Sequence, residues 1–153
     1  MDGRDSRWVD AVLDWRRTWL CARILLTSAY ILGGLTKLFD FPAAVAEQAH
    51  FGLHPGAPWA AMTVAVELPG SELIIFGRFV WLGAGALGVL TVVASVLAND
   101  FWDLHGQARF VAINSFFEHL GLISSLVLAA ILAEHEQRQA VNPQRRGAHL
   151  RAL

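Results

Sequence analysis

Long apolar stretches separated by short polar connectors make up most of the chain. Four of these stretches, at about 19–39, 59–76, 79–98 and 111–133, each approach the roughly 20 residues that a helix needs to cross a bilayer. The pattern predicts an all-α integral membrane protein, a four-helix bundle whose membrane domain covers residues 19–133.

Three segments outside the spans have patterns of their own. Over residues 1–18, tryptophans recur at helical spacing beside arginines, which is typical of an amphipathic helix lying in the membrane interface. In the first connector, Pro42 can open a short helix and Gly52 can close it. Residues 134–153 are polar and basic without periodicity, which predicts a disordered tail.

Composition supports a lipid environment. Only 16% of the 153 residues are charged, whereas soluble domains carry about 25%. The net charge of −1 gives no electrostatic reason to expect a nucleic-acid partner. Cys21 is the only cysteine, so an internal disulfide and a Cys-x-x-Cys pair are both excluded.

The distribution of basic residues predicts the orientation. Four spans place both termini on one side of the membrane, together with the short turn at Gly77 and Arg78. The basic residues of that side are Arg4, Arg7, Arg16, Arg17, Arg78, Arg138, Arg145, Arg146 and Arg151. Only Lys37 and Arg109 lie on the other side, so the positive-inside rule predicts that both termini are cytoplasmic.

Polar residues inside the first span lie on one helical face. Arg23, Tyr30 and Lys37 are seven residues apart in succession, a spacing that keeps them on one side of a helix. This face is expected to point toward protein. Alternatively, Arg23 and Lys37 only anchor the helix by reaching toward the two interfaces.

Glu67 is the central candidate for intramembrane chemistry. It lies near the middle of the second span, where an unpaired ionisable group costs about 2.5 kcal/mol or more. Arg23 and Lys37 are both candidate partners. In the fourth span, counting at 1.5 Å per residue places Glu118 at a depth similar to that of Glu67, with His119 beside it. The predicted polar cluster comprises Arg23, Tyr30, Lys37, Glu67, Glu118 and His119.

Two apparent motifs, one for a dinucleotide and one for a metal, do not support a cofactor. The Gly83–Gly88 segment matches GxGxxG, but it lies within an apolar helix-length run, so we expect close helix packing and no dinucleotide. Glu47, His50 and His54 have ligand-like spacing, but Gly52 and Pro55 interrupt it, so no metal site is predicted. Only one histidine lies within a span, so no haem held by two intramembrane histidines is expected.

The order of several motifs resembles the DoxX family of small four-helix membrane proteins, over about residues 23–132. The resemblance is carried by Arg23, Gly34-Leu35-Thr36-Lys37-Leu38, Phe41, Gly52, Glu67-Leu68-Pro69-Gly70, Gly77, Phe101-Trp102 and Gly121. It implies a location in the bacterial inner membrane. The family name comes from a membrane subunit associated with an archaeal thiosulfate:quinone oxidoreductase.

The resemblance and the polar cluster together favour one function class. We expect an accessory subunit of a quinone-linked redox or oxidative-stress membrane complex, with a quinone near Glu67 and electrons supplied by partner subunits. The alternative is a non-catalytic scaffold or assembly factor whose buried charges are structural. Solute or proton transport ranks third, because the two halves show no inverted repeat.

Overall fold

The chain is described by a computed structural model at residues 9, 16–98 and 101–151. Five helices occur in this part: α2 (Arg16–Phe39), α3 (Phe41–His50), α4 (Gly56–Phe76), α5 (Val80–Ala98) and α6 (Gly106–Arg151). Of these, α2, α4, α5 and α6 are long and apolar enough to cross a membrane. The predicted all-α fold with four spanning helices is therefore confirmed. Most of the predicted interfacial segment at 1–18 lies outside the described residues.

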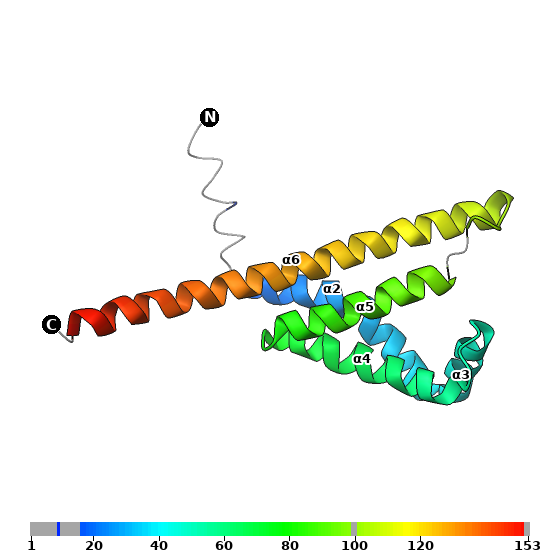
Figure 1. The fold of residues 1–153 in the computed structure, drawn as a ribbon, viewed down its shortest axis with the longest axis horizontal. Helices are drawn as coiled ribbons and strands as arrows, with labels where there is room; N and C mark the ends of the chain where they lie inside the picture. The colour runs from blue at the N-terminus through cyan, green and yellow to red at the C-terminus, as the bar shows by residue number, and fades with distance from the viewer. Residues whose placement is uncertain (1–8, 10–15, 99–100, 152–153) are drawn as a thin grey trace.

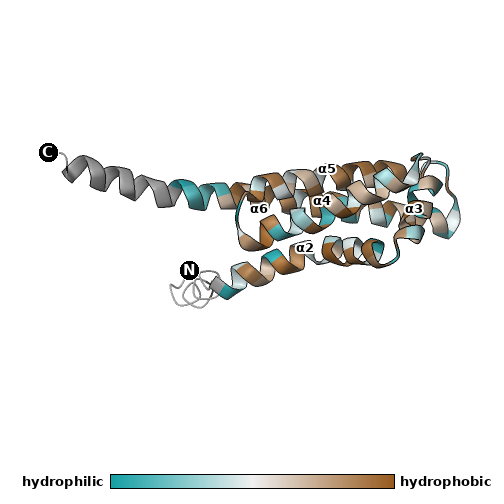
Figure 2. Cartoon of the chain, turned by 90° about the horizontal axis from the view of Figure 1, so that it is seen from below, coloured by the Kyte–Doolittle hydropathy of each residue, from teal (hydrophilic) through white to brown (hydrophobic). Residues whose placement is uncertain are grey.

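The spanning helices run alternately up and down. α4 packs against both α2 and α5, and α6 packs mainly against α5 (Figure 1). The start of α2 and the α4–α5 turn lie at one end of the bundle, and α3 covers the other (Figure 2). Leu25, Leu32 and Val89 are 73%, 69% and 66% exposed on the outer surface, as expected of side chains that face lipid.

Polar and small side chains line much of the bundle interior. Thr27 and Tyr30 of α2 are buried, as are Ser71 of α4 and Thr91 of α5. The polar face predicted for the first span therefore does point toward protein. The apolar core is a small cluster around Ile74 and Leu87.

The turn between α4 and α5 falls where the sequence predicts it. Gly77 has a φ of 70°, and its amide donates to the Ile74 carbonyl while the Arg78 amide donates to Leu73. This is a Schellman cap, which needs a residue in the left-handed region and therefore favours glycine.

The short connector helix α3 is also defined by local sequence. The Asp40 carboxylate accepts from the Ala43 amide 3.2 Å away and caps the helix, and Pro42 lies in its first turn. Gly52, with a φ of 78°, follows the helix end. Gly56 lets the start of α4 approach the Val45 carbonyl of α3, because a Cβ at Gly56 would clash with that oxygen.

Two glycine contacts bring α4 close to its neighbours. A Cβ at Gly34 of α2 would lie 2.8 Å from Leu68 Cδ2 of α4. A Cβ at Gly83 of α5 would lie 2.6 Å from the carbonyl oxygen of Gly70 of α4. The Gly83 contact is with backbone and requires glycine, whereas the Leu68 side chain would have to move to admit a Cβ at Gly34. In lipid, such close approaches replace hydrophobic burial as a source of helix association.

The C-terminal segment differs from the prediction of a disordered tail. α6 continues without interruption through residues 134–151, beyond the end of the apolar bundle (Figure 1). Extending an existing helix avoids the cost of nucleation, and Glu, Gln and Arg, which favour helix, make up half of this segment, whereas Pro143 adds no hydrogen bond because it lacks an N–H. Absence of hydrophobic periodicity therefore did not mean absence of helix.

The glycines of the GxGxxG segment provide a matched pair of variants. Gly83→Ala should lower the unfolding free energy by about 1–3 kcal/mol, because its Cβ meets the backbone of Gly70. A Cβ at Gly88 would meet nothing within 4 Å, so Gly88→Ala should leave the unfolding free energy unchanged or raise it by up to about 1 kcal/mol. Thermal unfolding of both variants in one detergent tests this, and equal effects would contradict the close α4–α5 contact.

Candidate functional site

Glu67 forms an ion pair with Lys37. The Lys37 Nζ atom lies 3.2 Å from Glu67 Oε1 and 3.4 Å from Oε2, and the two side chains are 17% and 10% exposed. Of the two bases that the sequence offered Glu67, the structure places Lys37 beside it. The pair joins α2 to α4 in a poorly solvated place, where each charge depends on the other.

Lys37 reaches Glu67 by lying back along its own helix. A Cβ at Gly33, one turn earlier in α2, would lie 3.4 Å from both Lys37 Nζ and Glu67 Oε1. Side chains on a helix lean toward its N-terminus, so the lysine ammonium is directed away from the nearer end of α2. Gly33 leaves the room in which the two charged groups meet.

The ion pair forms part of the wall of a pocket of about 270 Å³ beneath α3. Polar lining side chains besides the pair come from α3, α4 and α6 and are Glu47, Gln48, Thr63 and His119. The remaining wall is apolar and aromatic, and includes Trp59, Met62 and Leu90. A mostly apolar cavity with a few convergent polar groups is the usual form of a small-ligand site.

His119 and Tyr30 each join a different pair of helices. His119 Nδ1 lies 2.8 Å from Ser95 Oγ, which links α6 to α5 at the edge of the pocket. Tyr30 Oη lies 2.7 Å from Thr91 Oγ1, which links α2 to α5. The single hydroxyl hydrogen of Thr91 goes to the Leu87 carbonyl, so Tyr30 is the donor to Thr91. Tyr30 thus lies outside the pocket lining.

Arg23 lies at the other end of the bundle from this pocket. Its Nη2 is 3.7 Å from Glu136 Oε2 of α6, and a Cβ at Gly77 would be 2.5 Å from its Nη1. The guanidinium therefore lies beside the C-terminus of α4, where the helix dipole favours a positive charge. Fourteen residues of α2, about 21 Å along the helix axis at 1.5 Å per residue, separate Arg23 from Lys37.

Glu118 is also separate from the cluster that residue counting predicted. Its side chain is exposed on the outside of α6, whereas His119 faces α5. Successive helical residues differ by about 100° in direction, so both neighbours cannot face inward. His119 contacts Ser95, which lies only three residues before the end of α5. Glu118, the neighbour of His119, is therefore nearer the end of the bundle than its distance from residue 111 suggests.

Several pocket residues carry no clear signal in the sequence. Gln48 and Thr63 are buried neutral side chains, next to Glu47 and one turn before Glu67, and their own residue types do not distinguish them from solvent-facing positions. Ser95 and Thr91 recur at i and i+4 on α5, and that spacing on an otherwise apolar helix could have indicated a polar face.

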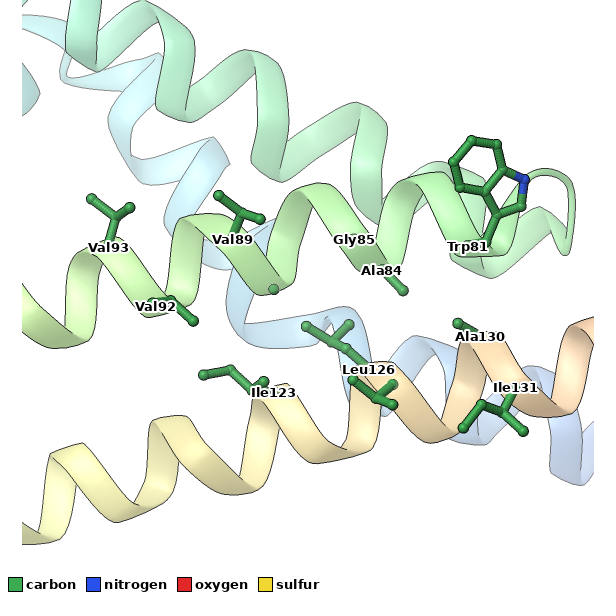
Figure 3. A pocket seen from close by; sticks show the side chains of 12 residues that line it. Trp81, Ala84, Gly85, Val89, Val92, Val93, Ile123, Leu126, Ala130 and Ile131 are labelled. Atoms are coloured by element: carbon green, nitrogen blue, oxygen red, sulfur yellow. The ribbon is translucent and has the colours of Figure 1, made fainter.

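A second cavity, of about 450 Å³, lies along α5 and α6 (Figure 3). Its lining is apolar, with Trp81, Val89 and Val92 on one side and Ile123 and Leu126 on the other. Gly85 and Gly88 face it, and a Cβ at either would meet nothing within 4 Å. The close packing expected of the GxGxxG glycines therefore holds for Gly83 and not for these two.

The connector residues with ligand-like spacing do not converge. His50 stacks edge-on against Phe51, with ring centroids 5.4 Å apart, and His54 is exposed. Glu47 alone of the three lines the pocket. Among the described residues, no group of three His, Cys, Asp or Glu side chains is placed to hold a metal ion.

Comparison with known proteins identifies the family. A sequence profile described as DoxX matches residues 18–100, more than half of the chain. The chain belongs to the DoxX family. It is similar to the inner membrane protein YphA of Escherichia coli strain K12, with 27% identity over 112 residues, which cover 73% of this chain and 80% of YphA. No solved structure matches the chain.

The DoxX profile covers only part of the candidate site. Residues 18–100 of this DoxX chain include the Lys37–Glu67 pair, Gly34 and Gly70, whereas His119 lies beyond the matched range. The chain is thus an integral membrane protein of the DoxX family with an ion pair and a pocket inside its bundle.

Proposed function

We propose that this DoxX protein is an accessory subunit of a quinone-linked redox or oxidative-stress membrane complex, and that the pocket beside Lys37 and Glu67 receives a quinone head group. The observation that carries the proposal is the position of the ion pair in the wall of a largely apolar cavity. The ion pair can donate hydrogen bonds and exchange protons, and the apolar wall around it suits the ring of a quinone.

The chemistry of the lining fits a quinone head group. A quinone carbonyl oxygen is an acceptor, and the Lys37 ammonium is a strong donor held in place by Glu67. Reduction of a quinone also consumes protons, which carboxylate, ammonium and imidazole groups can exchange. Glu67, Lys37 and His119 provide these groups, and Trp59 provides an aromatic surface for a ring.

The dimensions of the pocket fit a single ring. Its volume of about 270 Å³ lies just below the roughly 300–1,000 Å³ of typical ligand pockets, which suits a head group and not a dinucleotide. Met62, Leu90 and Val93 line the apolar part, where an isoprenoid chain would lead toward the lipid. Electrons would come from partner subunits, as the proposed accessory role requires.

A scaffold or assembly factor is the alternative. It is favoured because the polar contacts inside the bundle each hold two helices together, which is a structural role. These contacts are Lys37–Glu67 between α2 and α4, Tyr30–Thr91 between α2 and α5, and Ser95–His119 between α5 and α6. In this alternative the pair has no ligand, and the long helix α6 offers a surface to partner proteins.

We also propose a bacterial inner-membrane location with both termini in the cytoplasm. The relative YphA is named an inner membrane protein, and the positive-inside rule assigns the arginine-rich end to the cytoplasm. Alkaline phosphatase fused after Leu153 should be inactive, and the same enzyme inserted after Asp103 should be active. The reverse result would contradict this orientation.

Quinone binding tests the proposed function. Isothermal titration of the purified protein in detergent with a short-chain ubiquinone should show saturable binding. Glu67→Gln should raise the Kd about tenfold or more, because it removes the carboxylate that holds the Lys37 ammonium toward the quinone, and a hydrogen bond to a charged group is worth about 1.5–3 kcal/mol.

Glu118→Gln is the matched control for this titration. It removes a carboxylate from the same bundle at an exposed site outside the pocket, so the Kd should stay unchanged. Absence of saturable binding by the wild type would refute the quinone pocket. Loss of co-purifying membrane subunits from Glu67→Gln, without any quinone binding, would instead favour the scaffold.

A further inference from the structure

A second polar cavity lies at the opposite end of the bundle from the Lys37–Glu67 pocket. Its volume is about 670 Å³, and it is bounded by the start of α2, the end of α4 and α6 where that helix leaves the apolar region. The residues that the argument uses are Arg17, Trp19, Leu20, Arg23, Phe76 and Glu136. The quinone proposal makes no use of this cavity.

The lining combines cationic and apolar groups at the level where helices end. Arg17 and Arg23 lie six residues apart on α2, which is about 9 Å along the helix axis. Leu20 lies between the two arginines on α2 and is 46% exposed, and Phe76 at the end of α4 is 74% exposed. An amphiphile with an anionic head and apolar chains matches this order of groups.

Arg23 is held in a fixed position but is poorly neutralised. Its guanidinium lies against Gly77 at the α4–α5 turn, where a Cβ would be 2.5 Å from Nη1. The Glu136 oxygen is 3.7 Å from Nη2, beyond the 2.7–2.9 Å of a charge-assisted hydrogen bond, and the Glu136 side chain is 51% exposed. An ion pair this long and this exposed contributes little, so Arg23 retains its capacity for a stronger anionic partner.

We propose that this cavity binds the head group of an anionic phospholipid of the surrounding bilayer, with Arg17 and Arg23 on the phosphate and Leu20 and Phe76 along the acyl chains. Arginine presents several planar donors suited to phosphate oxygens. Trp19 also lines the cavity, and tryptophan is enriched at the membrane–water interface. Basic pockets between transmembrane helices are known sites for anionic lipids.

Glu136 sets the strength of this binding. Its carboxylate lies in the same cavity and competes with a phosphate for Arg23. General attraction of a basic membrane surface to anionic lipid predicts changes of the same sign, so the site is distinguished by an arginine at the same end of the bundle that lies outside the cavity.

Native mass spectrometry with titrated phosphatidylglycerol and phosphatidylcholine tests the proposal on the full chain. The wild type should bind the first phosphatidylglycerol several-fold more tightly than phosphatidylcholine. Arg17→Gln and Arg23→Gln should each reduce this preference roughly fivefold, as expected for one basic group near the headgroups. Glu136→Gln should increase it.

Arg78→Gln is the matched control. Arg78 is exposed at the same end of the bundle, in the α4–α5 turn, but does not line the cavity. Its substitution should leave the preference unchanged. Equal binding of the two lipids by the wild type, or an effect of Arg78→Gln as large as that of Arg17→Gln, would overturn the proposal. If Arg23→Gln lowers the melting temperature, Arg17→Gln and Glu136→Gln decide the test.

Discussion

The ion pair between Lys37 and Glu67 is the interaction on which the rest of the structure depends. In a bundle surrounded by lipid, an unpaired ionisable group is costly, so each member constrains the position of the other. Because the two groups belong to α2 and α4, the pair fixes how these helices meet. Gly33 and Gly34 permit the contact, one beside the charges and the other against Leu68. The same two side chains then form part of the wall of the pocket beneath α3.

The other helix contacts follow the same physical rule. Lipid is as apolar as leucine, so burial of apolar side chains does not drive helices together within the membrane. Polar bonds and close backbone contacts do so instead: Tyr30 bonds Thr91, His119 bonds Ser95, and α5 approaches α4 at Gly83. Large apolar side chains can consequently remain on the outside of the bundle. The pocket beneath α3 lies where this polar interior meets the end of the bundle.

Much of this arrangement could be predicted from the sequence, and its limits have a physical reason. Span length, the Gly77 turn and the polar face of α2 follow from local rules that act within one helix. The partner of Glu67 could not be chosen, because Arg23 and Lys37 lie on one face of α2 and their depth relative to Glu67 depends on how α2 and α4 are offset along their axes. The position of Glu118 was missed because depth was counted from residue 111, whereas the direction of a side chain depends on how α6 is rotated against α5. The rotation of α6 about its own axis depends on tertiary packing, and counting residues along the sequence does not predict it.

A double-mutant cycle on Lys37 and Glu67 tests the central claim most directly. The free energy of unfolding in detergent is measured for the wild type, Lys37→Met, Glu67→Gln and the double variant. Each single variant should cost about 3 kcal/mol, because it leaves a poorly solvated charge unpaired, and the double variant should cost clearly less than the sum. Additive costs would contradict the account, since they would mean that the two side chains do not depend on each other.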